Sequence, residues 1–588
     1  MTDAKKSGSE MKAYRYTYTG YDGFGRTAWT AEVSQEAEPT DAQIAKHKIS
    51  YSYDTEDKIT EVTYALAEDG RVESLHYAYD KNQYLIAIKA KIKGSDEEKL
   101  IRKYRYNERG KLFTIVDFTD YRDKNESYVA RFYEYDALDR VSSMTYKSGT
   151  TVLEAYTYSY DKNNNIVKKT EKNSTAKEEK DHTDQTTEYT YNALGRLTKS
   201  VVTDHKKNEE KTTTTYSYDS AGNRTKKVKG EEETAYTYNG LNQLLKAKTT
   251  KGNTVKNDIS YEYDVNGNQI KETDKETGDS VENTYDVENR LSTATVTKKS
   301  GTSGNETVSL TQENLYNGEG QRIQKKEAGE VTNYFYEDGM VSYTTGADTG
   351  EKLIQNLSGL EDNVIYAEQK VTGTDGTASD YQDFLYTKDI QGSTSSILNK
   401  DTKGELSYEY DDFGETSIHG NSALKNEICY TGGIYDESTG LYYLNARYYD
   451  PENGRFLTED TYRGEVNDPD TLHLYAYCAN DPINYVDPSG HMTISIAAGM
   501  KAIFATVSAA GLWPVAAVCV GILIAMYAHN KPKIVAKVTG KIISALLAVA
   551  CVAVKTREFV KKIAKTVAKA RVATKRGKDE KHHIVAQG

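Results

Sequence analysis

The sequence predicts an all-β protein in which hairpins repeat along most of the chain, and three observations support this. Tyr occurs 49 times in 588 residues, against 10 Phe and 2 Trp. No proline lies between Pro39 and Pro451, as expected for central strands in which every backbone N–H donates to a ladder. A chain this rich in Tyr, Thr and Gly is neither collagen nor intrinsically disordered.

The repeated unit is Tyr-x-Tyr followed by Asp or Asn, then a turn-forming cluster and an apolar residue. Copies occur at Tyr51–Asp54, Tyr77–Asp80, Tyr104–Asn107, Tyr133–Asp136, Tyr158–Asp161, Tyr189–Asn192, Tyr216–Asp219, Tyr236–Asn239, Tyr261–Asp264 and Tyr408–Asp411. From Tyr53 to Tyr263 they follow one another at intervals of roughly 20 to 31 residues, the length of one supersecondary unit with variable loops.

Each unit is predicted to be a β-hairpin with one aromatic face. Side chains alternate between faces along a strand, so both tyrosines of Tyr-x-Tyr point one way and the residue between them points the other way. The following Asp or Asn, with segments such as 193–197 and 220–224, supplies residues that tolerate a left-handed backbone. Because a lone hairpin is barely stable, neighbouring units are expected to pair edge to edge into one long sheet.

These repeats resemble the YD repeats of the Rhs family, over about residues 14 to 491. The resemblance implies hairpins that spiral into a hollow shell around the C-terminal part of the polypeptide. The alternative is an open β-solenoid that displays an adhesive or sugar-binding surface.

A denser block before the tail resembles the Rhs-associated core domain. Its motifs are Phe384–Ser393, Gly440–Asp460, Leu474–Tyr477 and Pro482–Gly490. Four of the seven prolines lie there, at 451, 469, 482 and 488, which indicates a turn-rich plug where the regular ladder stops. The chain is thus predicted to comprise a YD-repeat shell at 1–380, a core plug at 381–491 and a helical, hydrophobic and basic segment at 492–588.

Several relatives cut their own chain after this core motif. The resemblance puts the cut after His491, between His491 and Met492. Two carboxylates that approach closely can carry out such a hydrolysis, because their repulsion keeps one of them protonated. By position in the motif the pair is Asp460 and Asp487. Turn formation explains both aspartates as well, since Asp-Pro and Pro-Ser-Gly are common in turns.

Arg447 and Arg455 belong to the same block and are expected either to orient the carboxylates or to serve as structural ion-pair partners. The block departs from the family pattern at two positions. His491 stands where the family often has a bulky apolar residue, and Thr461 follows Asp460 where proline is common.

The tail differs from the body in charge and hydropathy. Residues 492–588 contain 16 Lys and Arg against 3 Asp and Glu, whereas residues 1–491 contain 60 against 85. The acidic body should repel nucleic acid and anionic membranes, and the basic tail should attract both. Residues 502–528 carry no formal charge and are numerous enough to span a bilayer; an apolar helix pair sheltered within protein is the alternative. Residues 531–578 have the pattern of a basic amphipathic helix.

The final residues, 581–588, resemble the opening His-His motif of AHH-type toxins of the HNH and endonuclease VII superfamily. The resemblance implies that His582 ligates a divalent metal, Mg²⁺ or Zn²⁺, and that His583 deprotonates the attacking water, or the reverse. That fold needs further His or Asn ligands, so we expect a truncated nuclease with an incomplete metal site. A histidine pair without function is the alternative. The shell itself is expected to need no cofactor.

These features predict an exported bacterial polymorphic-toxin protein whose shell encapsulates a C-terminal effector, delivers it and releases it by aspartyl autoproteolysis. Its expected partners are its own effector segment, an immunity protein, the target-cell membrane and, through the basic tail, nucleic acid. The alternative is a surface adhesin that binds carbohydrate and is anchored by its tail. Either protein would be secreted or on the cell surface; because residues 1–10 lack the apolar stretch of a signal peptide, we expect an unconventional export route or a signal encoded upstream.

Overall fold

The computed structural model describes residues 2–7, 10–65, 71–124, 126–300, 306–337, 339–347, 352–359, 364–371, 380–464, 469–491 and 493–496. The chain divides into two compact units, residues 1–19 with 29–512 and residues 20–28 with 513–588. The packing and the site discussed below lie in the first unit.

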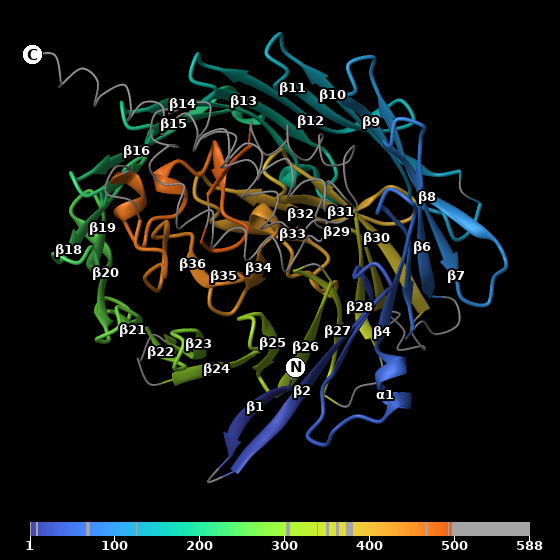
Figure 1. Cartoon of the computed structure of the whole chain (residues 1–588). Helices are drawn as coiled ribbons and strands as arrows, with labels where there is room; N and C mark the ends of the chain where they lie inside the picture. Colours follow the sequence, from blue (N-terminus) through green and yellow to red (C-terminus); the bar gives the residue numbers. More distant parts are fainter. Residues whose placement is uncertain are drawn as a thin grey trace, which may run out of the picture. The chain divides into compact units, whose positions relative to one another are not determined.

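Strands make up nearly all the regular structure, and the first 33 of them form one sheet (Figure 1). Its strands are β1 (Thr2–Ser7), β2 (Glu10–Tyr21), β3 (Thr27–Val33), β4 (Lys48–Tyr53), β5 (Ile59–Tyr64), β6 (Val72–Tyr79), β7 (Leu85–Ile92), β8 (Glu98–Tyr106), β9 (Leu112–Phe118), β10 (Tyr128–Tyr135), β11 (Val141–Ser148), β12 (Thr151–Tyr160), β13 (Ile166–Asn173), β14 (Thr183–Tyr191), β15 (Leu197–Asp204), β16 (Glu210–Tyr218), β17 (Arg224–Lys229), β18 (Glu232–Tyr238), β19 (Leu244–Lys251), β20 (Thr254–Tyr263), β21 (Gln269–Asp274), β22 (Ser280–Tyr285), β23 (Leu291–Ser300), β24 (Glu306–Tyr316), β25 (Arg322–Glu327), β26 (Glu330–Glu337), β27 (Met340–Thr345), β28 (Lys352–Ser358), β29 (Val364–Val371), β30 (Asp380–Lys388), β31 (Thr394–Leu398), β32 (Gly404–Tyr410) and β33 (Thr416–Gly420). Consecutive strands pair antiparallel, as in β12 with β13 and β13 with β14, so the predicted all-β fold of hairpins joined edge to edge is confirmed. Short helical segments α1 (Asp41–Lys46), η1 (Glu179–Asp181) and η2 (His205–Lys207) lie between strands.

The turns of the hairpins share one design, which explains why Asp or Asn follows each Tyr-x-Tyr. In the turn after β12, the Asp161 carboxylate accepts hydrogen bonds from the backbone N–H groups of Asn163 and Asn165, at 2.8 and 2.9 Å. Asn164 takes the left-handed conformation, with φ of 70°, which Asn and Gly adopt most readily. The same pair of bonds recurs at Asp54, Asp80, Asn107, Asp136, Asn192, Asn239, Asp264, Asp286, Asn317, Asp389, Asn399 and Asp411.

The second tyrosine of the unit links each hairpin to the one before it. The hydroxyl of Tyr160, at the end of β12, donates a 2.7 Å hydrogen bond to the carbonyl of Val141, the first residue of β11. Equivalent bonds join Tyr79 to Ile59, Tyr106 to Leu85, Tyr135 to Leu112, Tyr191 to Ile166, Tyr218 to Leu197, Tyr238 to Arg224, Tyr285 to Gln269, Tyr316 to Leu291, Tyr336 to Arg322 and Tyr410 to Thr394. These carbonyls lie where the turn shifts the ladder register, as at Val141 opposite Tyr135 and Ile166 opposite Tyr160, so the phenol satisfies an acceptor at the irregular end of the ladder.

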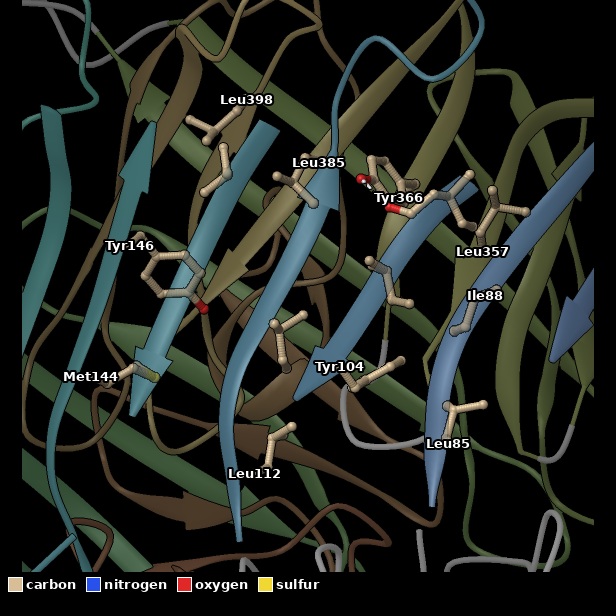
Figure 2. Packing of buried hydrophobic residues seen from close by; sticks show 14 of the residues in the cluster. Leu85, Ile88, Tyr104, Leu112, Met144, Tyr146, Leu357, Tyr366, Leu385 and Leu398 are labelled. Carbon is tan, nitrogen blue, oxygen red and sulfur yellow. Dashed lines mark hydrogen bonds between the residues drawn. The ribbon is translucent and has the colours of Figure 1, made fainter. Parts of the chain in front are cut away.

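The sheet curls so that late strands pack on early ones. Leu85, Ile88, Tyr104 and Leu112 of β7 to β9 share one buried cluster with Leu357, Tyr366, Leu385 and Leu398 of β28 to β31 (Figure 2). Hydrogen bonds also join late segments to early strands. Tyr366 donates to the carbonyl of Phe118 at 3.1 Å, and Ser200 of β15 donates to Asp412 after β32 at 2.5 Å. Burial of this apolar surface is the main stabilising contribution available to such a fold.

The core block forms a separate, turn-rich body against the sheet. Its elements are η3 (Tyr430–Gly432), β34 (Ile434–Asp436), β35 (Leu441–Leu444), β36 (Arg447–Asp450), β37 (Arg455–Phe456), η4 (Pro469–Leu472), η5 (Cys478–Asn480), β38 (Tyr485–Val486) and β39 (Ile494–Ser495). Its contacts with distant strands include three hydrogen bonds: the N–H of Arg322 donates to the Tyr443 hydroxyl at 2.7 Å, Arg224 donates to the carbonyl of Glu452 at 2.7 Å, and the N–H of Ile166 donates to Asn484 at 2.6 Å. The block therefore contacts β13, β17 and β25 at once.

Several predictions from the sequence lie outside the described residues: the apolar run 502–528, the basic helix 531–578, Met492, and the histidine pair His582 and His583. Within the part of the chain that the structure covers, helices are too short or too polar to cross a membrane. The boundaries at residues 380 and 491 stay predictions.

Candidate functional site

Asp487 lies in a turn built like those of the repeats. Its Oδ1 accepts hydrogen bonds from the N–H of His491, four residues on, at 3.1 Å and from the Ser489 hydroxyl at 3.2 Å. Gly490 takes the left-handed position with φ of 72°, as Asn164 does in the turn after β12. A Cβ at Gly490 would also lie 2.4 Å from the carbonyl oxygen of Leu444. Both the backbone conformation and the lack of space therefore require glycine at this position.

The segment after this turn returns along the strand before it. β38 and β39 pair antiparallel, with Tyr485 opposite Ser495 and Val486 opposite Ile494. The N–H of Ile496 extends the ladder by donating to Asn484 at 2.9 Å. The loop between residues 487 and 493 is therefore held at both ends.

Asp460 approaches the same loop from the other side of the block. Its backbone N–H donates to the carbonyl of Leu474 at 3.0 Å, and its Oδ1 accepts from the N–H of Tyr462 at 2.9 Å. Asp460 and Asp487 are 8% and 2% exposed, so both carboxyl groups lie in a poorly solvated environment. Asp460 thus caps a turn, which is the turn-forming alternative given for its motif, and its side chain also contacts His491 of the loop.

Arg447 connects the two aspartates. Its Nη2 lies 2.7 Å from Asp460 Oδ2 and 3.9 Å from Asp487 Oδ2. Its Nε donates to the carbonyl of Gly490, and its guanidinium stacks over the Phe456 ring at 3.6 Å from the centroid. Burial lowers the pKa of Arg447, and the two carboxylates oppose that shift. A guanidinium keeps its charge in proteins, so one fixed cation faces two carboxyl groups.

His491 completes the cluster. Its Nδ1 lies 2.9 Å from Asp460 Oδ1, and its side chain is 40% exposed. It borders a cavity of about 410 Å³ that also reaches Asp460, Arg447 and Ser489. The rest of the lining comes from the core block, including Glu459 and Arg463, and from hairpin turns, including Asn289 between β22 and β23. The site therefore has room for water.

The peptide between Gly490 and His491 is fixed at both polar atoms. Arg447 donates to its carbonyl and Asp487 accepts from its N–H. Asp460 and Asp487 are both buried and both face the guanidinium of Arg447. An arrangement of this kind can supply one carboxylate as a base and one carboxylic acid as a proton donor.

Comparison with known proteins decides the family. A family model described as Teneurin YD-shell matches residues 74–483. The chain belongs to the teneurin YD-shell family. Among curated proteins, the YD-shell chain is 32% identical over 348 residues to the tRNA3(Ser)-specific nuclease WapA of Bacillus spizizenii, covering 56% of this chain and 12% of that protein. It is 33% identical over 261 residues to the tRNA nuclease WapA of Bacillus subtilis strain 168, covering 43% and 10%.

The YD-shell chain thus spans about a tenth of the length of these relatives. Among solved structures, the crystal structure of TcdB2-TccC3 superposes with a TM-score of 0.59 at 16% identity, covering 83% of this chain and 26% of that one. The resemblance to the Rhs family of YD-repeat proteins is confirmed, and the fold is shared with that structure.

The YD-shell structure separates the two arginines of the core block. Arg455 donates to the carbonyl of Asn242 at 2.6 Å and lies over the rings of Tyr238 and Tyr475. These contacts join the block to the turn between β18 and β19, whereas Arg447 contacts the carboxylates. Among the residues that the structure describes, groups of three or more His, Cys, Asp or Glu that could hold a metal ion are absent.

One member of the YD-shell site, Ser489, was not among the residues that the sequence predicted. It donates to Asp487, and its position inside the Asp-Pro-Ser-Gly motif was the available signal. His491 was predicted as the residue before the cut, but the contact of its imidazole with Asp460, across 31 residues, was not predicted.

Proposed function

We propose that the YD-shell chain is the shell of a polymorphic toxin, which encapsulates a C-terminal effector and frees it by cutting its own backbone after His491. Three findings support the proposal: the family, the nuclease names of the Bacillus relatives, and the fold shared with the TcdB2-TccC3 structure. The shell would be secreted or displayed on the cell surface, as such toxins must leave the producing cell.

The observation that carries the autoproteolysis proposal is that Arg447 and Asp487 bind the backbone of residues 490 and 491, while Asp460 contacts Arg447 and the His491 side chain. The Gly490 carbonyl and the His491 N–H are both anchored, and in the proposal the peptide that follows lies within reach of the two carboxyl groups. Positioning of this kind removes much of the entropic barrier to reaction.

In the proposed reaction, ionised Asp460 takes a proton from water, whose oxygen adds to the carbonyl carbon of His491 while protonated Asp487 donates to the carbonyl oxygen. The tetrahedral intermediate then collapses. The C–N bond to Met492 breaks, its nitrogen takes the proton held by Asp460, and a hydroxyl of the intermediate returns a proton to Asp487. The products are a carboxylic acid on residue 491 and an amine on residue 492.

The effector in this proposal begins at Met492 and includes the basic tail. By the same resemblance, His582 and His583 open its nuclease motif, with His582 as the ligand of Mg²⁺ or Zn²⁺ and His583 as the base, or the reverse. An immunity protein would protect the producing cell, while the apolar and basic segments would meet the target-cell membrane and then nucleic acid.

The adhesin alternative is less well supported. Stacking on sugar needs an exposed ring, whereas the first tyrosines of the repeat, such as Tyr158, Tyr216 and Tyr261, are 4 to 5% exposed. Their partners at the second position donate to backbone carbonyls of the preceding hairpin. A glycan array probed with residues 1–491 would settle the matter, and we expect it to show no binding.

Self-cleavage is tested by expressing the full chain and separating it on a denaturing gel. We expect two fragments, with mass spectrometry giving one that ends at His491. Asp487→Asn and Asp460→Asn should leave the chain intact. Asp481→Asn is the matched control, because this buried aspartate also precedes a proline in the core block but hydrogen-bonds to Asn484. An intact wild-type chain, or cutting unaffected by Asp487→Asn, contradicts the proposal.

A further inference from the structure

Residues 473–480 of the core block are attached to a hairpin turn of the sheet. His473 Nε2 lies 2.8 Å from Asn223 Oδ1, in the turn between β16 and β17. The side chain of Asn480 donates to the carbonyl of Gly222, in the same turn, at 2.9 Å. Both ends of this segment therefore contact one turn.

The residue after His473 supports two members of the candidate site. The carbonyl of Leu474 accepts from the backbone N–H of Asp460 at 3.0 Å and from Nη1 of Arg447 at 2.9 Å. The contacts that hold His473 in place therefore also fix the carbonyl to which Asp460 and Arg447 donate.

Hydrogen bonds at both ring nitrogens suit only the neutral imidazole at His473. The amide nitrogen of Asn223 donates to Asp219 Oδ2 and to Asn242 Oδ1, each at 2.9 Å. The amide oxygen of Asn223 therefore faces His473, and Nε2 must carry the proton of the ring. Nδ1 accepts from the N–H of Tyr475 at 3.3 Å. A proton on Nδ1 would turn that hydrogen bond into a contact between two donors.

The surroundings of the ring also disfavour its charged form. Burial is the largest cause that lowers the pKa of His473, from 6.5 to about 3. Arg455 of β37 and Arg196, in the turn between β14 and β15, lower the pKa further, whereas Asp219 opposes them. Folding therefore excludes a proton that the free ring takes up in mild acid.

We infer that His473 forms an acid-sensitive contact: its neutral ring holds residues 473–480 on the turn between β16 and β17, and protonation of the ring in mild acid releases them. Release would also loosen the support of Asp460 and Arg447. The inference does not depend on self-cleavage, because a cut after His491 leaves residues 473–480 in the same chain as the sheet.

The direction of the pH dependence follows from the lowered pKa of His473. The released ring binds a proton that the attached ring does not, so release becomes easier as pH falls below 6.5 and levels off below about 3. Within that range the equilibrium constant for release should rise by about tenfold per pH unit. Asp481 has the opposite effect, since burial raises its pKa to about 7 and its protonation favours the attached form.

Hydrogen exchange of the full chain, measured by mass spectrometry at about pH 7.5 and about pH 5, reports the release. After correction for the intrinsic pH dependence of exchange, protection of residues 473–480 should fall at least about tenfold in the wild type, while β12 and β13 keep theirs. His473→Gln retains an amide donor for Asn223 but cannot be protonated. Its protection should match the wild type at the higher pH and change by less than about twofold at the lower one.

Two further variants complete the comparison. His473→Leu removes the donor as well, so residues 473–480 should be less protected than in the wild type at the higher pH. His205→Gln is the matched control, because it removes an exposed imidazole that lies 2.9 Å from Glu209, elsewhere in the sheet. Its profile should follow the wild type.

Wild-type protection that persists at about pH 5 overturns the inference, and this outcome needs no variant to fold. A His473→Gln profile that falls as the wild type does, or a His205→Gln profile that matches His473→Gln, overturns it as well. The proposed function fails in a different way, when the wild type stays uncut or Asp487→Asn still cuts.

Discussion

The guanidinium of Arg322 on β25 and the carboxylate of Asp436 on β34 form an ion pair in which both side chains are fully buried, with Nη1 2.5 Å from Oδ2. Lys325 adds a second cation at 3.2 Å. Burial alone would raise the pKa of Asp436, but these two cations hold it below its ordinary value. The pair joins the sheet to the core block at a point where water cannot replace either partner.

Asp436→Asn should therefore destabilise the protein strongly. It leaves the buried Arg322 guanidinium without this counter-charge, while Lys325 keeps its ion pair with Glu427, and breaking one side of a buried pair costs about 3 to 5 kcal/mol. The urea midpoint should fall accordingly. Glu313→Gln is the control, because the pair of Glu313 with Lys326 is about half exposed on each side and contributes about 1 kcal/mol or less. Equal effects of the two substitutions would show that Asp436 is not stabilised as described.

The ion pair between Arg322 and Asp436 also predicts how the stability of the fold depends on pH. A carboxyl group whose pKa is lowered by folding contributes stability above its unfolded pKa of about 3.9, and loses that contribution as pH falls through the lower folded value. The attachment of the core block should therefore persist into mildly acidic solution.

Glu154 is predicted to affect the pH dependence of stability in the opposite direction from Asp436. This fully buried carboxyl group on β12 accepts from the hydroxyls of Tyr156, Thr387 and Ser395 at 2.6 to 2.9 Å. Burial raises its pKa, and the hydroxyl donors only partly oppose this. A carboxyl group with a raised folded pKa stabilises the fold at low pH and loses that contribution as pH rises through the folded value.

Glu154→Gln should consequently raise the unfolding temperature at neutral pH and leave it unchanged at acidic pH, because the amide keeps the shape without the buried charge and the hydroxyls can rotate to accept from it. Thermal unfolding at several pH values measures this. A variant that is less stable than the wild type at neutral pH would mean that the ionised form is the one the site favours.

The hydrogen bond from the Tyr160 hydroxyl to the Val141 carbonyl is one of the bonds that recur between successive hairpins, so it can be used to test their contribution to stability. Tyr160→Phe removes the donor and leaves that carbonyl unsatisfied, which should cost about 1 to 2 kcal/mol in unfolding free energy. Tyr128→Phe is the control, because Tyr128 on β10 is 38% exposed and loss of an exposed hydroxyl should change stability by less than about 0.5 kcal/mol. Indistinguishable urea midpoints would show that the hairpins do not depend on these hydroxyls.

The hairpin fold was predictable because its signals are local. Tyr-x-Tyr sets the face of the strand, and the Asp or Asn that follows sets the turn, all within a few residues. The hydrogen bond from Tyr160 to Val141 was not predictable, because it joins two hairpins and depends on the register between them. The curl that brings Tyr366 of β29 to the carbonyl of Phe118 on β9 lies further still beyond any local pattern.

The candidate site shows the same limit. Resemblance to the family singled out Asp460 and Asp487, but it did not distinguish Arg447 from Arg455, because both sit in the same motif. Only long-range packing separates them: one arginine reaches the carboxylates and the other the carbonyl of Asn242. Their roles in cutting stay predictions until cleavage is measured.

Arg447→Lys should slow self-cleavage by at least about tenfold. Lysine keeps the charge, but its ammonium cannot contact Asp460, the Gly490 carbonyl and the Leu474 carbonyl together as the planar fork does. Arg455→Lys is the matched control, since it is equally buried and should leave the cleavage rate nearly unchanged if the chain folds. If Arg447→Lys and Arg455→Lys slow self-cleavage equally, Arg447 contributes to folding and not specifically to the cut.

Gly490→Ala offers a test that leaves every charged group in place. An alanine at φ of 72° bears about 1 to 2 kcal/mol of strain, and here its Cβ would also meet the Leu444 carbonyl oxygen at 2.4 Å. The loop must then shift away from Arg447 and Asp487, and self-cleavage should be lost. Gly320→Ala carries the same strain, with φ of 85°, but its Cβ meets nothing within 4 Å, so it should cut at the wild-type rate. If Gly490→Ala folds and cuts normally, the hydrogen bonds to residues 490 and 491 do not position the cut.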